Sequence, residues 1–251
     1  MRKRSRDRLR RWLLASAAAL AALAAAFWLT LPSAEPLRHA NPATTALMNA
    51  RSQQARARGR AGRRNQHWVP LSRISPWLQR AVVNSEDARF YEHEGIDLTQ
   101  TGIALETAVE RGKLGRGAST LTQQLAKNLW LGEQRSLWRK LREYFLARRL
   151  EALGKPRILE LYLNVAEWGD GIYGADAAAR VWFHKPAAEL LPEEAAVLAA
   201  MLPAPRRRSP AKPSQHLRQR AREVVELYLV YHQLSPEEAA QARARLAALG
   251  L

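Results

Sequence analysis

The sequence Val-Asn-Ser-Glu-Asp-Ala-Arg-Phe-Tyr-Glu-His-Glu-Gly, residues 83–95, concentrates acidic side chains in a chain that is otherwise basic. Its titratable acids and its histidine are Glu86, Asp87, Glu92, His93 and Glu94. Val82 and Phe90 lie close to Glu86 in sequence, and apolar surroundings raise the pKa of a carboxyl group. Glu86 is therefore a candidate proton-handling group. The alternative is that these carboxylates cap a helix or balance nearby arginines, because structural ion pairs cluster in the same way.

The composition places the stretch in a helical protein with a strong positive field. The chain has 251 residues, with 40 Lys and Arg against 23 Asp and Glu, for a net charge of +17. Such a field favours anionic partners such as nucleic acid, acidic lipid head groups or phosphate-bearing substrates. The absence of cysteine excludes a disulfide framework and a thiolate metal site. Alanine and leucine dominate over β-branched residues, which predicts a mainly α protein.

The N-terminal region has the pattern of a membrane anchor. Seven basic side chains occur in residues 2–11, and no residue from 12 to 34 is charged. A helix of that length spans about 35 Å, enough for a hydrocarbon core of about 30 Å. The run exceeds the roughly 7–15 residues of a signal-peptide core, and Pro32-Ser33-Ala34 fits a cleavage site poorly. We therefore expect a transmembrane helix over residues 12–34.

Charge asymmetry predicts how this helix is oriented. Arg38 is the only Lys or Arg between residues 35 and 50, so the positive-inside rule places the basic tail, residues 1–11, in the cytoplasm. The rest of the chain then faces the opposite compartment, which disfavours a nucleic-acid-binding role. Residues 51–64 contain six arginines, no acid and no apolar period. This pattern predicts a basic linker over residues 35–66, lying on anionic lipid heads, before a folded domain over residues 67–251.

Residues 117–130 read Gly-Ala-Ser-Thr-Leu-Thr-Gln-Gln-Leu-Ala-Lys-Asn-Leu-Trp and predict a helix with two different faces. Thr120 and Gln123 form a capping box at its start. Leu121, Leu125 and Leu129 recur every four residues as a buried stripe. The other side carries Thr120, Gln124, Lys127 and Asn128. A helix N-terminus with hydroxyls, amides and one lysine is expected to hold phosphate oxygens, although an ordinary amphipathic helix would have the same pattern.

Further helical segments follow. Residues 137–151 place Arg139, Lys140 and Glu143 on one face, which taken alone is most often a surface ion pair. The other segments with a helical pattern are residues 98–109, 155–168, an Ala-rich stretch from 175, 191–202, 215–233 and 235–249.

Four motifs occur together in an order and spacing that resemble one enzyme family. They are Glu86-Asp87-x-x-Phe90-x-x-His93-x-Gly95, Gly117-x-Ser119-Thr120-x-Thr122-Gln123-Gln124-Leu125-x-Lys127-Asn128, Arg139-Lys140-x-x-Glu143 and Ile158-Leu159-Glu160-x-Tyr162-Leu163-Asn164. From about residue 68 to about residue 205 the chain resembles the peptidoglycan glycosyltransferases. Its length and single N-terminal span are similar to the monofunctional biosynthetic members, since we expect no room for the transpeptidase domain of class A penicillin-binding proteins. One departure is Trp182, where the family usually has tyrosine before Phe183.

The resemblance implies a lysozyme-like, two-lobed helical domain, in which residues 98–109 belong to a smaller lobe that dips into the membrane. It also implies an inverting hexosyltransferase of cell wall biogenesis and cell shape. The substrate would be lipid II, a disaccharide-pentapeptide on undecaprenyl pyrophosphate, and the product a β-1,4 glycan still attached to its lipid. The expected location is the bacterial inner membrane, with a periplasmic catalytic domain. Expected partners are the growing glycan strand, the membrane, and cell wall synthases or divisome proteins, with no nucleic acid.

The resemblance also implies roles for the motif residues. Glu86 would be the catalytic base for the sugar 4-hydroxyl. Lys127, Arg139 and Lys140 would stabilise the departing pyrophosphate. Glu143, the second catalytic residue, would orient those cations or hold a divalent ion, Mg²⁺ or Mn²⁺, against the diphosphate; no tightly bound cofactor is expected. The remaining substrate-binding candidates are Asp87, Phe90, His93, Ser119, Thr120, Gln124 and Asn128.

Two other functions remain open at this stage. A membrane-anchored lysozyme-like hydrolase or lytic transglycosylase would cut glycan, but it would not need the carboxylate-free segment 117–131 because no diphosphate leaves. A non-catalytic basic envelope scaffold or nucleic-acid binder would depend on the arginines. Such a binder should tolerate Glu86→Gln, whereas the glycosyltransferase should not.

Overall fold

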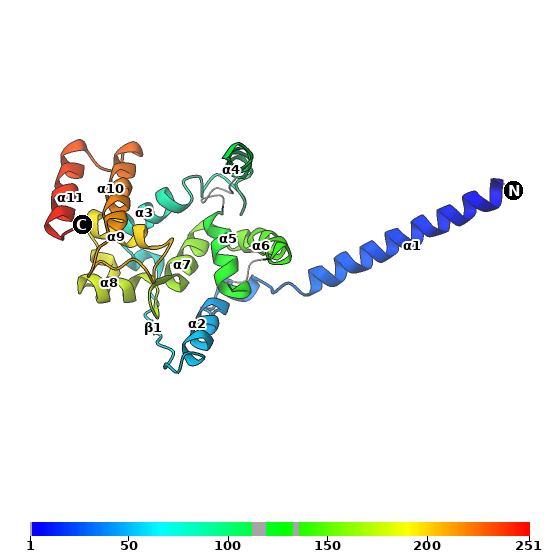
Figure 1. Ribbon diagram of the computed structural model, residues 1–251, viewed down its shortest axis with the longest axis horizontal. Coiled ribbons are helices and arrows are strands. Elements are labelled where there is room, and N and C mark those ends of the chain that lie inside the picture. Colours follow the sequence, from blue (N-terminus) through cyan, green and yellow to red (C-terminus); the bar gives the residue numbers. More distant parts are fainter. Residues whose placement is uncertain (1, 112–118, 133–135) are drawn as a thin grey trace. The chain divides into compact units, whose positions relative to one another are not determined.

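The structure is a computed structural model that describes residues 2–111, 119–132 and 136–251, and it contains two compact units, residues 1–33 and 34–251. The first unit is helix α1 (Arg2–Leu29) (Figure 1). Its segment Arg10–Leu29 is long and apolar enough to cross a membrane, with a mean hydropathy of 2.0. The helix ends five residues before the expected end at residue 34. Pro32 accounts for the difference, because proline lacks an N–H group and disfavours helical backbone in the residue before it.

The second unit is mainly helical, as the sequence predicts. Its helices are α2 (Ala46–Arg56), α3 (Pro76–Glu86), α4 (Leu98–Arg111), α5 (Leu121–Ala126), α6 (Leu137–Leu150), α7 (Lys155–Val165), α8 (Ala175–Phe183), α9 (Pro192–Met201), α10 (Gln215–Val230) and α11 (Pro236–Ala248). Its strands are β1 (Asn65–Gln66), β2 (Glu167–Gly169) and β3 (Ile172–Tyr173). A single π-helical turn, Lys127–Leu131, continues α5. The expected helix over 155–168 ends at Val165, where the chain turns into β2.

One core forms around α9, whose residues from Glu193 to Met201 are all buried. Helices α3, α10 and α11 pack against it and lie together at one end of the second unit (Figure 1). The apolar face of α10 contributes Leu217, Ala221, Val224, Val225 and Tyr228. The Tyr228 hydroxyl donates to the Trp77 carbonyl at 2.9 Å. This packing fixes α3, and therefore the position of Glu86 at its last turn.

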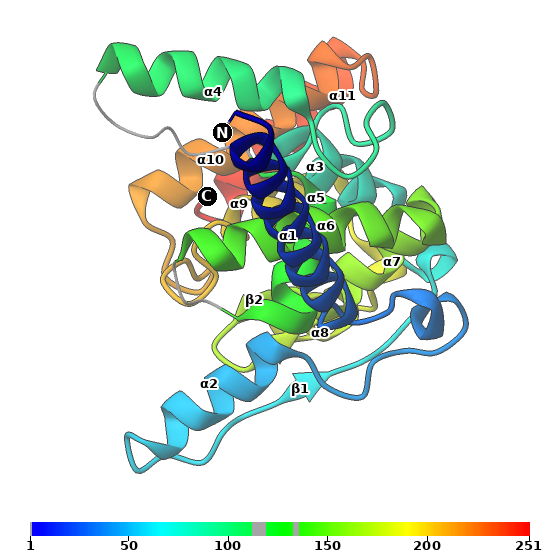
Figure 2. The same cartoon turned by 90° about the vertical axis from the view of Figure 1, so that its right-hand side faces the viewer.

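A second core forms where α5 packs against α6 and α7. The predicted stripe of Leu121, Leu125 and Leu129 is buried there, which confirms the helical pattern. Leu146 and Leu150 of α6 are also fully buried. Helix α4 lies at the edge of this unit in both views (Figures 1 and 2), and its Leu98 and Ile103 are exposed. The side chains of Leu105 and Val109, two other apolar residues of this segment, lie outside the described part of the structure.

The segment expected to be an unstructured basic linker is folded in large part. Thr45 caps α2 by accepting a hydrogen bond from the Met48 amide at 3.2 Å, and Leu47 and Met48 are buried. Farther along, β1 pairs in parallel with β3, which pairs antiparallel with β2, giving the order β1-β3-β2. The compact unit thus begins at Ala34, whereas the arginine pattern suggested a start at residue 67. Leu47 and Met48, the two buried apolar residues before most of the arginines, anchor the start of α2.

Candidate active site

Glu86 is the last residue of α3, and the helix brings it to the edge of the α5 core. Its Oε2 accepts a hydrogen bond from Gln124 Nε2 at 3.0 Å. Gln124 Oε1 in turn accepts from the hydroxyl of the buried Tyr162 at 2.9 Å. Burial raises the pKa of Glu86, while the Gln124 hydrogen bond and nearby positive charges act in the opposite direction. The result is a carboxyl group with a raised pKa held by a fixed donor, which suits a general base.

The residues of this hydrogen-bonded chain line two different cavities. Glu86 and Ser119 line one cavity of about 180 Å³. Gln124, Lys127 and Asn128 line the other, of about 150 Å³. The hydrogen bond from Gln124 to Glu86 therefore joins a wall residue of one cavity to a wall residue of the other. The structure therefore brings the predicted base close to the polar face of α5.

The cations of α6 are arranged around a single buried carboxylate. Arg139 and Lys140 each approach Glu143 at 2.5 Å, through different oxygens. Glu143 is only 3% exposed, whereas the Lys140 side chain is 47% exposed. The Lys140 Nζ also donates to Ser119 Oγ at 3.2 Å. This contact links the cations of α6 to the cavity that contains Glu86.

Both oxygens of Glu143 are thus occupied by positively charged groups. A divalent ion needs free oxygen ligands, and the two adjacent cations would repel it. Among the residues that the structure describes, no group of three His, Asp or Glu side chains could hold a metal ion. In this arrangement neither oxygen of Glu143 is free to coordinate a divalent ion.

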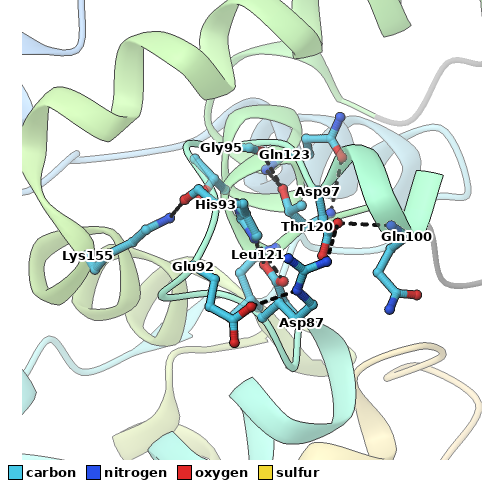
Figure 3. A network of polar contacts seen from close by, with 12 residues as sticks. Asp87, Glu92, His93, Gly95, Asp97, Gln100, Thr120, Leu121, Gln123 and Lys155 are labelled. Carbon is cyan, nitrogen blue, oxygen red and sulfur yellow. Dashed lines mark hydrogen bonds and ion pairs between the residues drawn. The ribbon is translucent and has the colours of Figure 1, made fainter. Parts of the chain in front are cut away.

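Asp87, next to the base, is the centre of a buried polar network (Figure 3). Its carboxylate contacts His93 Nε2 at 2.9 and 3.1 Å and accepts a hydrogen bond from the Leu121 amide at 2.8 Å. Burial raises the pKa of Asp87, and the His93 and Leu121 hydrogen bonds oppose this effect. The network joins the loop after α3 to the start of α5. Asp87 and His93 consequently have partners within the protein, although Asp87 also lines the Glu86 cavity.

Three amides at the start of α5 donate to protein groups. The Thr120 amide donates to Gln123 Oε1 and the Gln123 amide to Thr120 Oγ1, both at 3.1 Å, which is the predicted capping box. The Leu121 amide donates to Asp87. The predicted phosphate contacts through this N-terminus would have to displace these bonds. Gly117, the first residue of the motif, lies outside the described residues.

Gly95 shows why the first motif ends in glycine. Its φ is +86°, and a Cβ atom there would lie 3.0 Å from the Ala147 carbonyl oxygen. Its own carbonyl accepts a hydrogen bond from Thr120 Oγ1 at 2.6 Å (Figure 3). A left-handed backbone and a close approach both favour glycine. Phe90, from the same motif, is fully buried beneath this loop, with Lys155 Nζ 4.6 Å from its ring centroid.

Some residues of the site were not among the sequence candidates. Tyr162 belongs to the fourth motif, but no sequence pattern indicates that its hydroxyl donates to Gln124. Arg51 lines the cavity of Lys127 and pairs with Glu167 at 2.8 Å, but nothing in its sequence surroundings distinguishes it from the other arginines. Trp182, the departure from the family pattern, donates its indole N–H to the Trp168 carbonyl at 3.2 Å.

Comparison with known proteins identifies the family. The family model described as Transglycosylase matches residues 52–228. A biosynthetic peptidoglycan transglycosylase of Laribacter hongkongensis is 47% identical over 167 residues, which is 66% of this chain and 73% of the relative. The protein of the same name from Chromobacterium violaceum is 44% identical over 192 residues, which is 74% and 84% of the two chains. With a helical domain that carries all four motifs, this chain belongs to the transglycosylase family.

Proposed function

We propose that Glu86 is the general base with which this protein, a peptidoglycan glycosyltransferase of cell wall synthesis, joins lipid II into β-1,4 glycan and releases undecaprenyl pyrophosphate. The observation that carries this assignment is the hydrogen-bonded chain Tyr162–Gln124–Glu86. It holds one carboxylate oxygen of Glu86 in a fixed direction at the wall of one cavity, through a glutamine that lines the other. Among the described residues Asp87 also has a raised pKa, but it contacts α5 through the Leu121 backbone amide.

The base step uses the Glu86 carboxylate. A sugar 4-hydroxyl is a weak nucleophile, and transfer of its proton to a positioned base contributes roughly 10²–10⁴-fold. Its raised pKa makes Glu86 a better proton acceptor than an exposed glutamate, while Gln124 and the positive charges around it favour the ionised form at neutral pH. The oxygen of the acceptor sugar then attacks the anomeric carbon of the donor, and the bond from that carbon to the pyrophosphate oxygen breaks.

The cations of α5 and α6 stabilise the leaving group. A departing pyrophosphate carries the bonding electrons away as negative charge, and charge-assisted hydrogen bonds to fixed cations lower the energy of that state. Lys140 and Arg139, oriented by Glu143, approach from the Ser119 side. Lys127 and Asn128 approach from the second cavity. Base and leaving group on opposite faces of the donor sugar give inversion, as in inverting glycosidases.

The membrane context follows from α1. We propose a single-pass protein of the bacterial inner membrane with a cytoplasmic N-terminus, on the basis of the charge asymmetry around this helix. A lipid-linked substrate and an anchored enzyme then share two dimensions, which raises their effective concentration. We also propose that cell wall synthases or divisome proteins associate with the domain, and co-purification from cross-linked cells would identify them.

The activity is tested with labelled lipid II and the full-length protein in detergent, the products being separated on a gel. The expected result is a ladder of lipid-attached glycan that lysozyme digests. A second reaction supplies preformed glycan, and its shortening without any ladder from lipid II would replace the proposal by the hydrolase alternative. A third reaction contains a chelator. Since both oxygens of Glu143 are paired with cations, we expect the ladder to persist, and its loss would assign a divalent ion to the reaction.

A further inference from the structure

Five arginines surround a cavity of about 360 Å³ beside α2, which we call the arginine basin. They are Arg51, Arg58, Arg60, Arg63 and Arg206. Four of them come from α2 and the chain that follows it, and the fifth comes from the loop after α9. Guanidinium groups gathered around one cavity repel one another, and an anion bound in the cavity would offset that repulsion.

Backbone contacts fix the chain segment that carries most of these arginines. Gly59 adopts a φ of +67°, and the Arg60 amide donates to the Ala55 carbonyl at 3.0 Å, so the chain reverses tightly after α2. A Cβ atom on Gly62 would lie 3.1 Å from the Ser52 backbone, which shows how closely the returning chain packs on the helix. Figure 2 shows α2 and the returning chain that leads to β1 along one edge of the second unit.

A second contact fixes the far side of the basin. Gly171 has a φ of +76°, and a Cβ atom there would lie 2.7 Å from both the Cβ and the carbonyl oxygen of Arg63. The Asn65 amide donates to the Gly171 carbonyl at 2.8 Å, immediately before β1 pairs with β3. The arginine-bearing chain is therefore attached to the sheet. This segment forms one wall of the cavity.

The carboxylates near the basin do not balance its charge. Arg51 pairs with Glu167 at 2.8 Å, and Arg206 pairs with Asp170 at 3.0 Å. Within the part of the chain that the structure describes, Arg58, Arg60 and Arg63 have no ion pair. Five guanidinium groups against two carboxylates leave three positive charges around the cavity.

We propose that the arginine basin is a binding site for a phosphate-bearing anion, separate from the catalytic residues. Guanidinium groups present planar pairs of N–H donors that match phosphate oxygens. A diphosphate or a phospholipid head group supplies several such oxygens and enough negative charge to offset the unpaired arginines. Since Arg51 lines both the basin and the cavity of Lys127, a bound phosphate would lie next to the site where the leaving group departs.

The test uses inorganic pyrophosphate as the probe and the full-length protein in neutral detergent, with affinity measured by calorimetry. The basin variant is Arg58→Gln, Arg60→Gln and Arg63→Gln together. Loss of three charge-assisted contacts is expected to weaken binding by at least about tenfold.

The matched control removes the same charge elsewhere, by Arg73→Gln, Arg218→Gln and Arg222→Gln, all exposed positions outside the basin. It is expected to bind within about twofold of the parent, since exposed charges farther than about 10 Å apart are largely screened at ordinary ionic strength. Equal weakening by both triple variants would mean a general field effect and would overturn the proposal. An unchanged affinity of the basin variant, with circular dichroism showing that it is folded, would also overturn it.

Two further arms identify the source of the phosphate and separate this inference from the catalytic proposal. In nanodiscs, competition between pyrophosphate and phosphatidylglycerol, absent with phosphatidylcholine alone, would identify a lipid head group. Pyrophosphate binding that is unchanged in both kinds of nanodisc and still weakened in the basin variant would identify a free or leaving diphosphate. Glu86→Gln should leave the affinity for pyrophosphate unchanged. The proposal for the basin and the proposal for Glu86 can therefore be refuted independently.

Discussion

The contact between Gln124 and Glu86 yields a quantitative prediction. Gln124→Leu retains most of the side-chain volume but removes the N–H donor that lies 3.0 Å from Glu86 Oε2. A hydrogen bond to a charged group contributes about 1.5–3 kcal/mol. Because Glu86 is half-buried, water can replace part of the lost hydrogen bond. We therefore take the net loss as about 1.4 kcal/mol. Because this bond also holds the carboxylate in position for the acceptor hydroxyl, its loss should lower kcat/KM in lipid II polymerisation by a comparable factor, roughly tenfold.

The pH profile provides the specific signature of this variant. The Gln124 hydrogen bond lowers the pKa of Glu86 against the larger effect of burial, so its removal raises that pKa further. Glu86 must be ionised to accept a proton, and activity is lost as the pH falls through its pKa. The acidic limb of the kcat/KM profile should therefore move to higher pH in Gln124→Leu.

Tyr162→Phe serves as the matched variant, since it removes only the hydroxyl that orients Gln124. Its expected effect is smaller, about threefold, because the bond between Gln124 and Glu86 remains. The double variant should resemble Gln124→Leu alone, because groups in one network do not act additively. If the acidic limb of Gln124→Leu stays at the parent's pH and the rate is unchanged, the hydrogen-bonded chain does not control the orientation and pKa of Glu86.

Three further predictions concern the support of the site. Asp87→Ala leaves the buried Leu121 amide without an acceptor, and the thermal unfolding temperature should fall with a loss of about 2–3 kcal/mol; an unchanged temperature would contradict the network in Figure 3. Glu143→Gln frees the two cations that it positions, so kcat should fall about tenfold or more while KM changes little; the reverse pattern would indicate a role in binding alone. Gly171→Ala places a methyl group against Arg63 at a positive φ, costing about 1–3 kcal/mol, and trypsin should then cut faster at residues 58–64 than in the parent.

The sequence was sufficient to predict the helices and their termini in most cases. The stripe of Leu121, Leu125 and Leu129 and the capping box of Thr120 and Gln123 are local patterns, and both are present in the structure. The helix predicted from residue 191 appears as α9, ended before Pro203. Local patterns succeed here because the same residues that favour a helix also face the core.

The folded state of residues 46–66 could not be predicted in the same way. Its arginines suggested a solvated linker, but long-range contacts decide its structure. One is the pairing of β1 with β3, and another is the close approach of Arg63 to Gly171, more than 100 residues away in sequence. Contacts between distant segments leave no periodic signal in either segment.

The candidate site shows the same division. The motifs supplied Glu86, Gln124 and Glu143, but they did not indicate that Gln124 donates to Glu86 or that Glu143 is occupied by two cations. Those facts depend on how α3, α5 and α6 pack. They support the first of the two roles predicted for Glu143, which is to orient Arg139 and Lys140.

The rate of lipid II polymerisation by Glu86→Gln tests the central claim most directly. The amide keeps the size of the side chain but cannot accept the proton of the sugar hydroxyl, so the rate should fall by about 10²–10⁴-fold. Glu92→Gln is the control, because Glu92 is an exposed carboxylate of the same acidic stretch and pairs with the partly exposed Arg89; its rate should stay within about twofold of the parent. A Glu86→Gln protein that polymerises lipid II as fast as the Glu92→Gln control would contradict the assignment of Glu86 as the base.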